Sequence, residues 1–304
     1  MTRAGPRGNR WLAAAALALA SMPLWAESYH MQLASTAAIA AMFALSLQLL
    51  VGAAGLISLA HAGFFGIGAY TVYLLGGGRS VFVSLPAAML LSGLAAAAIG
   101  YLALRTRGFY FLMTTLAFGQ MLFFLFHDTP LGGGADGVFI ARPGMIWTVT
   151  KNARPAVFLL MNLFVLAAMY LLLWKLMGTL FGHALTGIRA NEDRMRAMGH
   201  DVQRLKLTAF VMAGALAGVA GHMAAMTDAF VSPELLGWHH SAEALLMVLL
   251  GGLGALHGPI LGAFALTLIR ELGQSITERQ RLVEGIAILA AVLLLRRGIA
   301  GLRR

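Results

Sequence analysis

Residues 181–206 read FGHALTGIRANEDRMRAMGHDVQRLK and form the longest polar run between hydrophobic segments of this 304-residue chain. The chain is 60% hydrophobic and only 11% charged, and its mean hydropathy is +0.80. Because a soluble domain of this size needs far more charge on its surface, the composition predicts a polytopic helical membrane protein. The polar run is then a loop outside the bilayer that joins segments within it.

This loop carries the signals of a short amphipathic helix. Asn191 is a favoured N-cap residue, and Glu192 lies in the first turn, where the helix dipole stabilises a carboxylate. Glu192 and Arg196 stand four residues apart and are expected to pair, and Gly199 is placed to end the helix. If the preceding turn is also helical, one apolar stripe is predicted from Ala184, Ile188, Met195 and Met198. The loop is either a solvated connector on the lipid surface or a docking helix for a soluble partner.

Ten hydrophobic segments are predicted to cross or enter the membrane. Several approach the ~20 apolar residues that span a bilayer. Three are shorter and fit half-helices or re-entrant segments, which are tolerated where protein or water covers the backbone. The predicted fold is therefore all-α, with about ten (8–10) transmembrane helices in a single domain, residues 1–304. The segments are 11–26, 32–52, 62–76, 81–104, 108–127, 156–177, 207–227, 241–256, 258–271 and 282–296; the short ones are 62–76 and the pair split at His257-Gly258-Pro259.

Basic residues predict how these segments are oriented. With a cytoplasmic N-terminus, ten crossings return the C-terminus to the cytoplasm, and eight crossings would keep the 181–206 loop on the same side. The positive-inside rule favours this orientation, which places the loop in the cytoplasm. It also accounts for the net charge of +10 without a nucleic-acid partner. Only seven of the 22 Lys and Arg residues then fall outside, namely Arg79, Arg142, Lys151, Arg154, Arg270, Arg279 and Arg281.

The first segment has two interpretations. Arg3, Arg7 and Arg10 precede the apolar run 11–26, as in a secretory signal with Ala26 as a cleavage end. We interpret the run instead as a retained first helix.

The sequence lacks the motifs of enzymes and nucleotide-driven pumps. It has no cysteine and no Gly-Lys pair, which excludes thiolate chemistry and a P-loop within these residues. His239, His240 and Glu243 form a compact trio, for which a solvated loop is preferred to a metal site. No catalytic residue, metal site or cofactor is therefore predicted, and the chain is expected not to be an enzyme.

Charged residues are almost absent from the middle of the hydrophobic segments, which counts against an ion-coupled carrier. His222 is the one titratable group well inside segment 207–227, and we expect it to be hydrogen-bonded between helices. Polar residues without a fixed charge remain as candidates for a translocation path, or alternatively as hydrogen-bond partners of backbone groups. These are Ser58, His61, Thr114, Thr115 and Gln120. The pattern indicates a passage without its own energy source.

The chain also contains a weak internal repeat. GLISLAHAGFFG at 55–66 is similar to GLGALHGPILG at 252–262 with one gap, and both are centred on Leu-His. An ancient duplication and a chance match in a chain rich in Gly, Leu and Ala both explain the similarity.

Six blocks in order resemble the LivM-type permeases, the membrane subunits of branched-chain amino-acid ABC importers. They cover about 50 to 271, so the resemblance is specific. The blocks are GLISLAHAGFFGIGAYTVYLL (55–75), RTRGFYFLMTTLAFGQ (105–120), GGGADGV (132–138), FGHALTGIRANEDRMRAMG (181–199), KLTAFVMAGALAGVAG (206–221) and MVLLGGLGALHGPILGA (247–263).

The resemblance implies an importer-permease fold in which residues 188–199 are the counterpart of the EAA loop, a coupling helix that sits in a groove of the ATPase. The loop 181–206 would then be cytoplasmic and EAA-like, although the Glu-Ala-Ala start is not matched, since Asp193 and Arg194 follow Glu192. The implied ATPase-coupling residues are Ile188, Arg189, Asn191, Glu192, Arg196, Ala197 and Gly199.

The resemblance further implies the setting of the protein. The expected partners are a second related permease subunit, two ATP-binding subunits, a periplasmic substrate-binding protein and the lipid bilayer. The expected location is the bacterial inner membrane, with both termini cytoplasmic. The implied solute is a branched-chain or related amino acid. Urea or short amides within the same family, and a stand-alone secondary carrier, are the alternatives.

Overall fold

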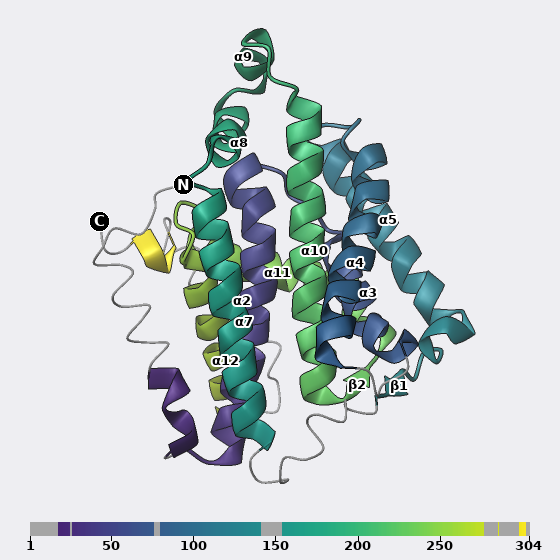
Figure 1. The fold of residues 1–304 in the computed structure, drawn as a ribbon, viewed down its shortest axis with the longest axis vertical. Coiled ribbons are helices and arrows are strands. Elements are labelled where there is room, and N and C mark those ends of the chain that lie inside the picture. Colours follow the sequence, from purple (N-terminus) through teal and green to yellow (C-terminus); the bar gives the residue numbers. More distant parts are fainter. Residues whose placement is uncertain are drawn as a thin grey trace. The chain divides into compact units, whose positions relative to one another are not determined.

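The computed structural model describes residues 18–24, 26–75, 80–140, 154–276, 285 and 298–301, and these are mainly helical (Figure 1). Five described helices are long and apolar enough to cross a membrane: Ser28–Ala54, Val81–Ala103, Phe109–His127, Arg154–Leu176 and Val202–Asp228. The predicted all-α class is therefore confirmed, whereas the predicted total of about ten crossings stays a prediction. Most of segment 11–26, and nearly all of 282–296, lie outside the described residues.

The described helices follow the predicted segments to within a few residues at most ends. They are α2 (Ser28–Gln48), the π-helix η2 (Leu49–Ala54), α3 (His61–Leu74), α4 (Val81–Ala103), α5 (Phe109–His127), α7 (Arg154–Leu176), α8 (Leu180–Ala190), α9 (Glu192–Ala197), α10 (Val202–Asp228), α11 (Trp238–Gly251) and α12 (Gly258–Ile276). Short 3-10 turns are η1 (Met22–Leu24), η3 (Pro130–Gly132), η4 (Pro233–Leu236) and η5 (Ile299–Gly301).

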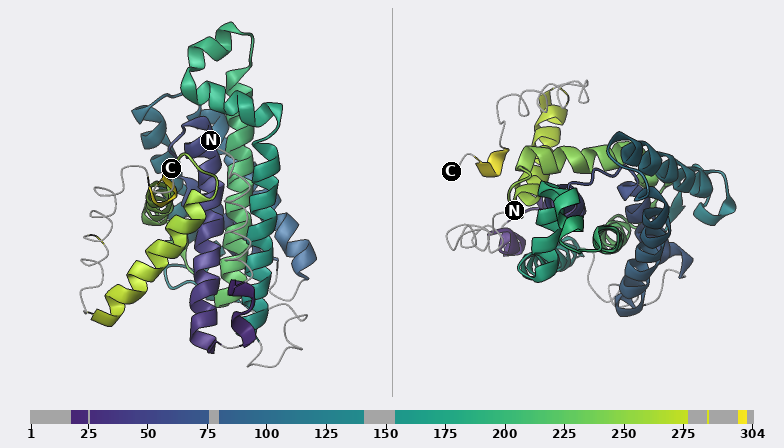
Figure 2. Two further views of the ribbon diagram at one scale, coloured as in Figure 1. Left: turned by 90° about the vertical axis from the view of Figure 1, so that its left-hand side faces the viewer. Right: turned by 90° about the horizontal axis from the view of Figure 1, so that it is seen from above.

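The chain forms two compact units. The first consists of Met1–Gln48, Asn152–Trp174 and Ala244–Arg304, and the second of Leu49–Lys151 and Lys175–Glu243. In the first unit α12 packs obliquely across α2 (Figure 2). Asn162 of α7 donates a hydrogen bond of 2.5 Å to Ser35 of α2, so these two helices are joined by a buried polar contact.

The first unit also contains the predicted break at His257-Gly258-Pro259. Helix α11 ends at Gly251, Gly252 adopts a left-handed φ of 107°, and α12 begins at Gly258. The Gln48 side-chain amide donates to the carbonyls of Leu253 (3.1 Å) and Ala255 (3.3 Å). These bonds give partners to carbonyls of the non-helical segment between α11 and α12, where the Ala255 carbonyl also accepts from the Gly258 N–H at 3.1 Å.

In the second unit α10 packs along α3 and α4 (Figures 1 and 2). Glycines allow this contact, because a Cβ at Gly68 would lie 2.1 Å from the Gly218 carbonyl oxygen. A Cβ at Gly221 would lie 1.8 Å from the Phe65 carbonyl oxygen. Ser92 of α4 donates to the Phe64 carbonyl at 2.9 Å. Small residues that bring backbones this close are typical of helix packing in membranes.

The two ends of α10 differ in character. Its 27 residues span about 40 Å at 1.5 Å per residue. Helices α8 and α9 lie at its N-terminal end (Figure 1). At its C-terminal end β2 (Phe230–Val231) pairs antiparallel with β1 (Val138–Phe139), a small ribbon that the all-α prediction did not include. The polar loop and this ribbon are thus held apart by the length of one helix.

The close approach of α3 and α10 predicts that Gly221→Ala destabilises the fold. The new methyl group would meet the Phe65 backbone, which cannot rotate away, so overpacking of at least about 1–3 kcal/mol is expected. Gly93→Ala is the matched control at the α4–α10 contact, because its Cβ would lie an ordinary 3.5 Å from Ala215 Cβ. Melting of the purified protein in detergent should show a lower midpoint for Gly221→Ala only. Equal midpoints for the two variants would contradict this packing.

Candidate functional site

The polar loop folds as two helices that meet at Asn191. The backbone of Asn191 is extended (φ −161°, ψ 104°), which ends α8 and allows α9 to begin at Glu192. The Asn191 side-chain oxygen accepts a hydrogen bond of 2.9 Å from the Arg194 backbone N–H. The predicted N-cap is therefore confirmed, and it satisfies one of the free N–H groups of the first turn.

Gly199 ends α9 as predicted. Its φ of 84° is left-handed, and its N–H donates to the Arg196 carbonyl at 2.9 Å. His200 N–H donates to the Met195 carbonyl at 3.2 Å. The chain then turns into α10, where Asp201 accepts a bond of 3.1 Å from the Arg204 N–H. Sequence reasoning missed this second cap, although an Asp before an apolar helix is a signal that could have found it.

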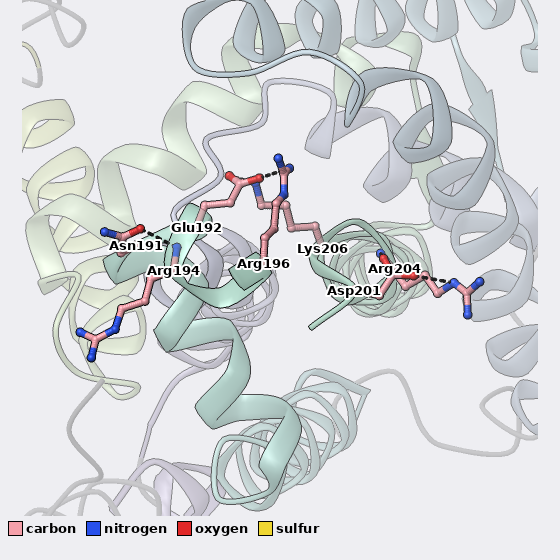
Figure 3. A network of polar contacts seen from close by, with 7 residues as sticks. All are labelled: Asn191, Glu192, Arg194, Arg196, Asp201, Arg204 and Lys206. Atoms are coloured by element: carbon pink, nitrogen blue, oxygen red, sulfur yellow. Dashed lines mark hydrogen bonds and ion pairs between the residues drawn. The ribbon is translucent and has the colours of Figure 1, made fainter. Parts of the chain in front are cut away.

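Glu192 is the centre of an ion-pair network that ties α9 to α10 (Figure 3). Its carboxylate lies 2.6 Å from Arg196, as predicted, and 2.5 Å from Lys206 of α10. Partial burial alone would raise the pKa of Glu192. The hydrogen bond and charge of Lys206, with the charges of Arg196 and Arg107, outweigh burial and hold the pKa below its ordinary value. The contact with Lys206 stabilises the angle between the two helices.

The predicted apolar stripe is only partly correct. Ile188 and Met195 are buried, with exposed fractions of 3% and 7%, but Met198 is 58% exposed. The stripe assumed one continuous helix, whereas the extended backbone at Asn191 changes the direction of the chain between α8 and α9. Met198 therefore leaves the buried side and becomes part of the exposed surface of α9.

The seven residues predicted to contact an ATPase separate into three groups. Arg189 donates to the Gly52 carbonyl, and Ile188 is buried. Asn191, Glu192, Arg196 and Gly199 hold the shape of the loop through the contacts given above. Ala197 lies on the exposed side of α9 together with Asp193, Arg194 and Met198. In Figure 3 the Arg194 side chain points away from the Glu192 network. The exposed residues were largely missed because the sequence does not show which side of α9 faces the protein.

The five predicted path residues lie on α3, α5 and the segment between η2 and α3. Ser58, His61 and Thr115 are buried, whereas Thr114 and Gln120 are half-buried. Thr115 accepts a bond of 3.2 Å from the Leu59 N–H and donates to the Leu112 carbonyl at 2.8 Å. For Thr115 the geometry therefore fits the alternative of hydrogen bonding to backbone.

Ser241 of α11 completes this support and was not predicted. Its hydroxyl donates to the Leu59 carbonyl at 2.9 Å and accepts from the Ala62 N–H at 2.8 Å. Both backbone groups of Leu59 are thus bonded to buried hydroxyls, one from α5 and one from α11. Ser58 differs, because its buried hydroxyl has no hydrogen-bond partner among the described residues.

The expectation for His222 is confirmed, whereas the solvated loop predicted for His239, His240 and Glu243 is wrong, because these residues lie in the first turns of α11. His222 Nε2 lies 2.8 Å from Ser84 Oγ, which forms the expected hydrogen bond between helices. In the trio considered for metal, the His239 ring lies against Trp238, and His240 lies 3.5 Å from Glu243. No group of three or more potential ligands that could hold a metal ion occurs within the described parts of the chain.

Comparisons with known proteins place these features in a family context. The family model described as "Branched-chain amino acid transport system / permease component" matches residues 29–295. The LivM permease proteins of the high-affinity branched-chain amino acid transport systems of Escherichia coli and Salmonella typhimurium are each 33% identical over 266 residues, covering 79% of this chain and 63% of theirs. A probable LivM of Methanocaldococcus jannaschii is 28% identical over 165 residues, covering 54% of this chain and 47% of its own. This chain thus spans less than two thirds of the length of these relatives. No solved structure matches it.

The network around Glu192 predicts that Glu192→Gln loosens α9. Losing the charge-assisted bond to Lys206, which is 12% exposed, should cost about 1.5–3 kcal/mol and speed amide exchange across residues 192–198 roughly tenfold or more, whereas the more exposed pair with Arg196 contributes little. Arg204→Gln is the control, since its pair with Asp201 is 88% and 53% exposed and should contribute little. Equal exchange rates in α9 for the two variants would show that the Glu192 contacts do not hold α9 against α10.

The lowered pKa of Glu192 gives a second readout of the same contact. Its stabilising contribution is fully present above the ordinary Glu pKa of ~4.3 and is lost as pH falls through the lowered folded value. Protection of α9 in the wild type should therefore persist at pH values where a free glutamate is already protonated, and Glu192→Gln should abolish this pH dependence.

Proposed function

We propose, on the premise that this chain belongs to the branched-chain amino acid transport permease family, that it is the permease subunit of an ATP-driven importer. In this proposal the solute is a branched-chain or related amino acid. A periplasmic binding protein delivers the solute, a second related permease completes the passage, and two separate ATP-binding subunits supply the energy. The relatives named above are described only as transport permeases, and the partners follow from the proposed importer arrangement.

The main support for this proposal is the rigidity of the 181–206 loop. Two caps, a left-handed glycine and the Glu192 network fix a six-residue helix at the end of α10. Together these contacts make α9 a rigid projection rather than a loose connector. Because α9 is joined to the long, buried helix α10, it is suited to transmitting a displacement from a soluble partner to α10.

The exposed side of α9 is the proposed docking surface. We define it as Asp193, Arg194, Ala197 and Met198. An exposed methionine rimmed by an arginine and a carboxylate fits a groove that is apolar at its base and polar at its edges, since Met and Arg are enriched at protein interfaces. The proposed partner is the ATP-binding subunit, and the loop would lie on the cytoplasmic side, as the distribution of basic residues predicts.

The proposed mechanism is a shift between two populations. ATP binding closes the ATPase subunits, which moves the docking surface and favours one of two cavity states of the paired permeases. The solute needs only weak affinity within the passage, because the binding protein provides capture. A path lined by polar groups without fixed charge suits a zwitterion, whose net charge is zero.

Among the proposed path residues, Ser58 has the strongest support. Its buried, unpartnered hydroxyl is available to a solute or a water molecule, and such groups are otherwise costly. His61, Thr114 and Gln120 remain candidates. The hydrogen bonds of Thr115 favour a supporting role.

Location and topology complete the proposal. The protein is placed in the bacterial inner membrane with about ten crossings, both termini in the cytoplasm, and residues 1–304 acting as one permease domain. Urea or short amides are alternative solutes, because specificity would reside mainly in the binding protein.

The docking surface predicts that Met198→Asp weakens binding of the ATP-binding subunits about tenfold or more, since truncating an interface anchor typically costs at least ~2 kcal/mol. Gln203→Glu is the matched control, because it adds the same charge at an exposed position on α10, off α9. Copurification and ATP-dependent uptake into proteoliposomes should both fall for Met198→Asp and persist for Gln203→Glu.

The same preparation tests the function itself. Uptake by the wild-type assembly should stop without ATP and survive collapse of the proton gradient. Uphill uptake by this chain alone, driven by the proton gradient, would replace the importer proposal with a secondary carrier.

A further inference from the structure

The π-helix η2 ends at a carbonyl that needs a donor. Residues Leu49–Ala54 are all buried, and the Leu56 N–H reaches back to the Leu50 carbonyl at 3.0 Å. The last turn of any helix leaves carbonyls without intrahelical partners, and a cation is the favoured group beside them. The Gly52 carbonyl lies in this turn and accepts a hydrogen bond from the Arg189 guanidinium.

Arg189 also contacts the turn that follows η2. Gly55 has a left-handed φ of 72°, and a Cβ built on it would lie 3.1 Å from Arg189 Cγ. The aliphatic part of the arginine therefore lies across Gly55 while its head bonds Gly52. A residue on α8 thus holds both the end of η2 and the start of the segment that links η2 to α3.

The far end of this linking segment, residues 55–60, is held by other helices. The Leu59 N–H and carbonyl are bonded to Thr115 of α5 and Ser241 of α11. Between the two attachment points lie Ile57, which is 43% exposed, and the unpartnered hydroxyl of Ser58. The segment is therefore non-helical, fixed at both ends, and attached to the polar loop through Arg189.

We infer that Arg189 is a positioning residue that carries displacement of the α8–α9 loop to the linking segment 55–60. This inference rests on the proposed function. Helices α8 and α9 are joined directly at Asn191, so a force on α9 moves α8. The Arg189 head follows α8 and moves the Gly52 carbonyl and the Gly55 turn, while Thr115 and Ser241 hold Leu59. The displacement is then taken up at Ile57 and Ser58.

The chain's lack of cysteine makes this displacement measurable. Ile57→Cys places a single thiol in the linking segment, in an importer assembled with cysteine-free partners and reconstituted into proteoliposomes. The reaction rate with a maleimide is compared between the nucleotide-free state and a state trapped with ATP and vanadate. ATP hydrolysis, uptake and copurification of the ATP-binding subunits are measured on the same samples.

In the Arg189→Gln variant we expect ATP hydrolysis and ATPase binding to persist, while the difference in labelling rate between the two states disappears. Uptake should fall by about tenfold, which is typical of coupling between sites. Arg189→Lys keeps the charge and a donor and should recover part of both signals. Arg204→Gln removes the same charge at the start of α10, outside the docking surface, where the side chain is 88% exposed, and should leave the labelling difference at Ile57→Cys unchanged.

Three results would overturn the inference. One is a labelling difference and uptake in Arg189→Gln equal to the wild type. Another is loss of ATPase binding in that variant, which would make Arg189 a docking contact. The third is a wild-type labelling rate that is the same in both states. If the wild type shows no ATP-driven uptake at all, the proposed function fails instead, which is a distinguishable outcome.

Discussion

Backbone groups that leave a helix away from water need another partner, and this requirement shapes two breaks between described helices, at 55–60 and 252–257. The break at 55–60 is bonded by Arg189, Thr115 and Ser241, and the break at 252–257 by Gln48. Each break starts at a left-handed glycine, Gly55 or Gly252. Each is followed by a new helix six residues later. The local likeness gives the weak repeat in the sequence a structural counterpart, whether it arose by duplication or by chance.

Within the second unit, the middle and the start of α10 make different kinds of contact. Glycine contacts with α3 and α4 make the middle of this helix rigid, because backbones meet with no side chain between them. At its start, Asp201 caps α10 itself, and Lys206 connects α10 to α9 through Glu192. The arginine that reaches from α8 to Gly52 gives the loop a second route into the protein, independent of α10. In the proposed function, the rigid 181–206 loop is attached to the second unit through both α10 and Arg189, and it can therefore move buried segments without unfolding.

Local sequence signals predicted the features that depend on neighbours in the chain. The bounds of most helices, the Asn191 cap, the Glu192–Arg196 pair and the glycine that ends α9 all follow from spacing of one to four residues. Features that depend on distant neighbours were missed. Lys206 lies 14 positions from Glu192, and Ser241 lies 182 positions from Leu59. The direction predicted for Met198 was wrong because one extended residue, Asn191, redirects the chain. The contact of Arg189 with the Gly52 carbonyl was missed because the two residues stand 137 positions apart.

The proposed coupling to ATP-binding subunits requires the polar loop to face the compartment that holds ATP. A single cysteine at Met198, in this cysteine-free chain, tests this directly with a membrane-impermeant maleimide. In vesicles stripped of peripheral subunits, the account predicts rapid labelling when the cytoplasmic face is outward and none when it is inward, with full labelling of both after detergent. Labelling from the periplasmic face of sealed membranes would contradict it.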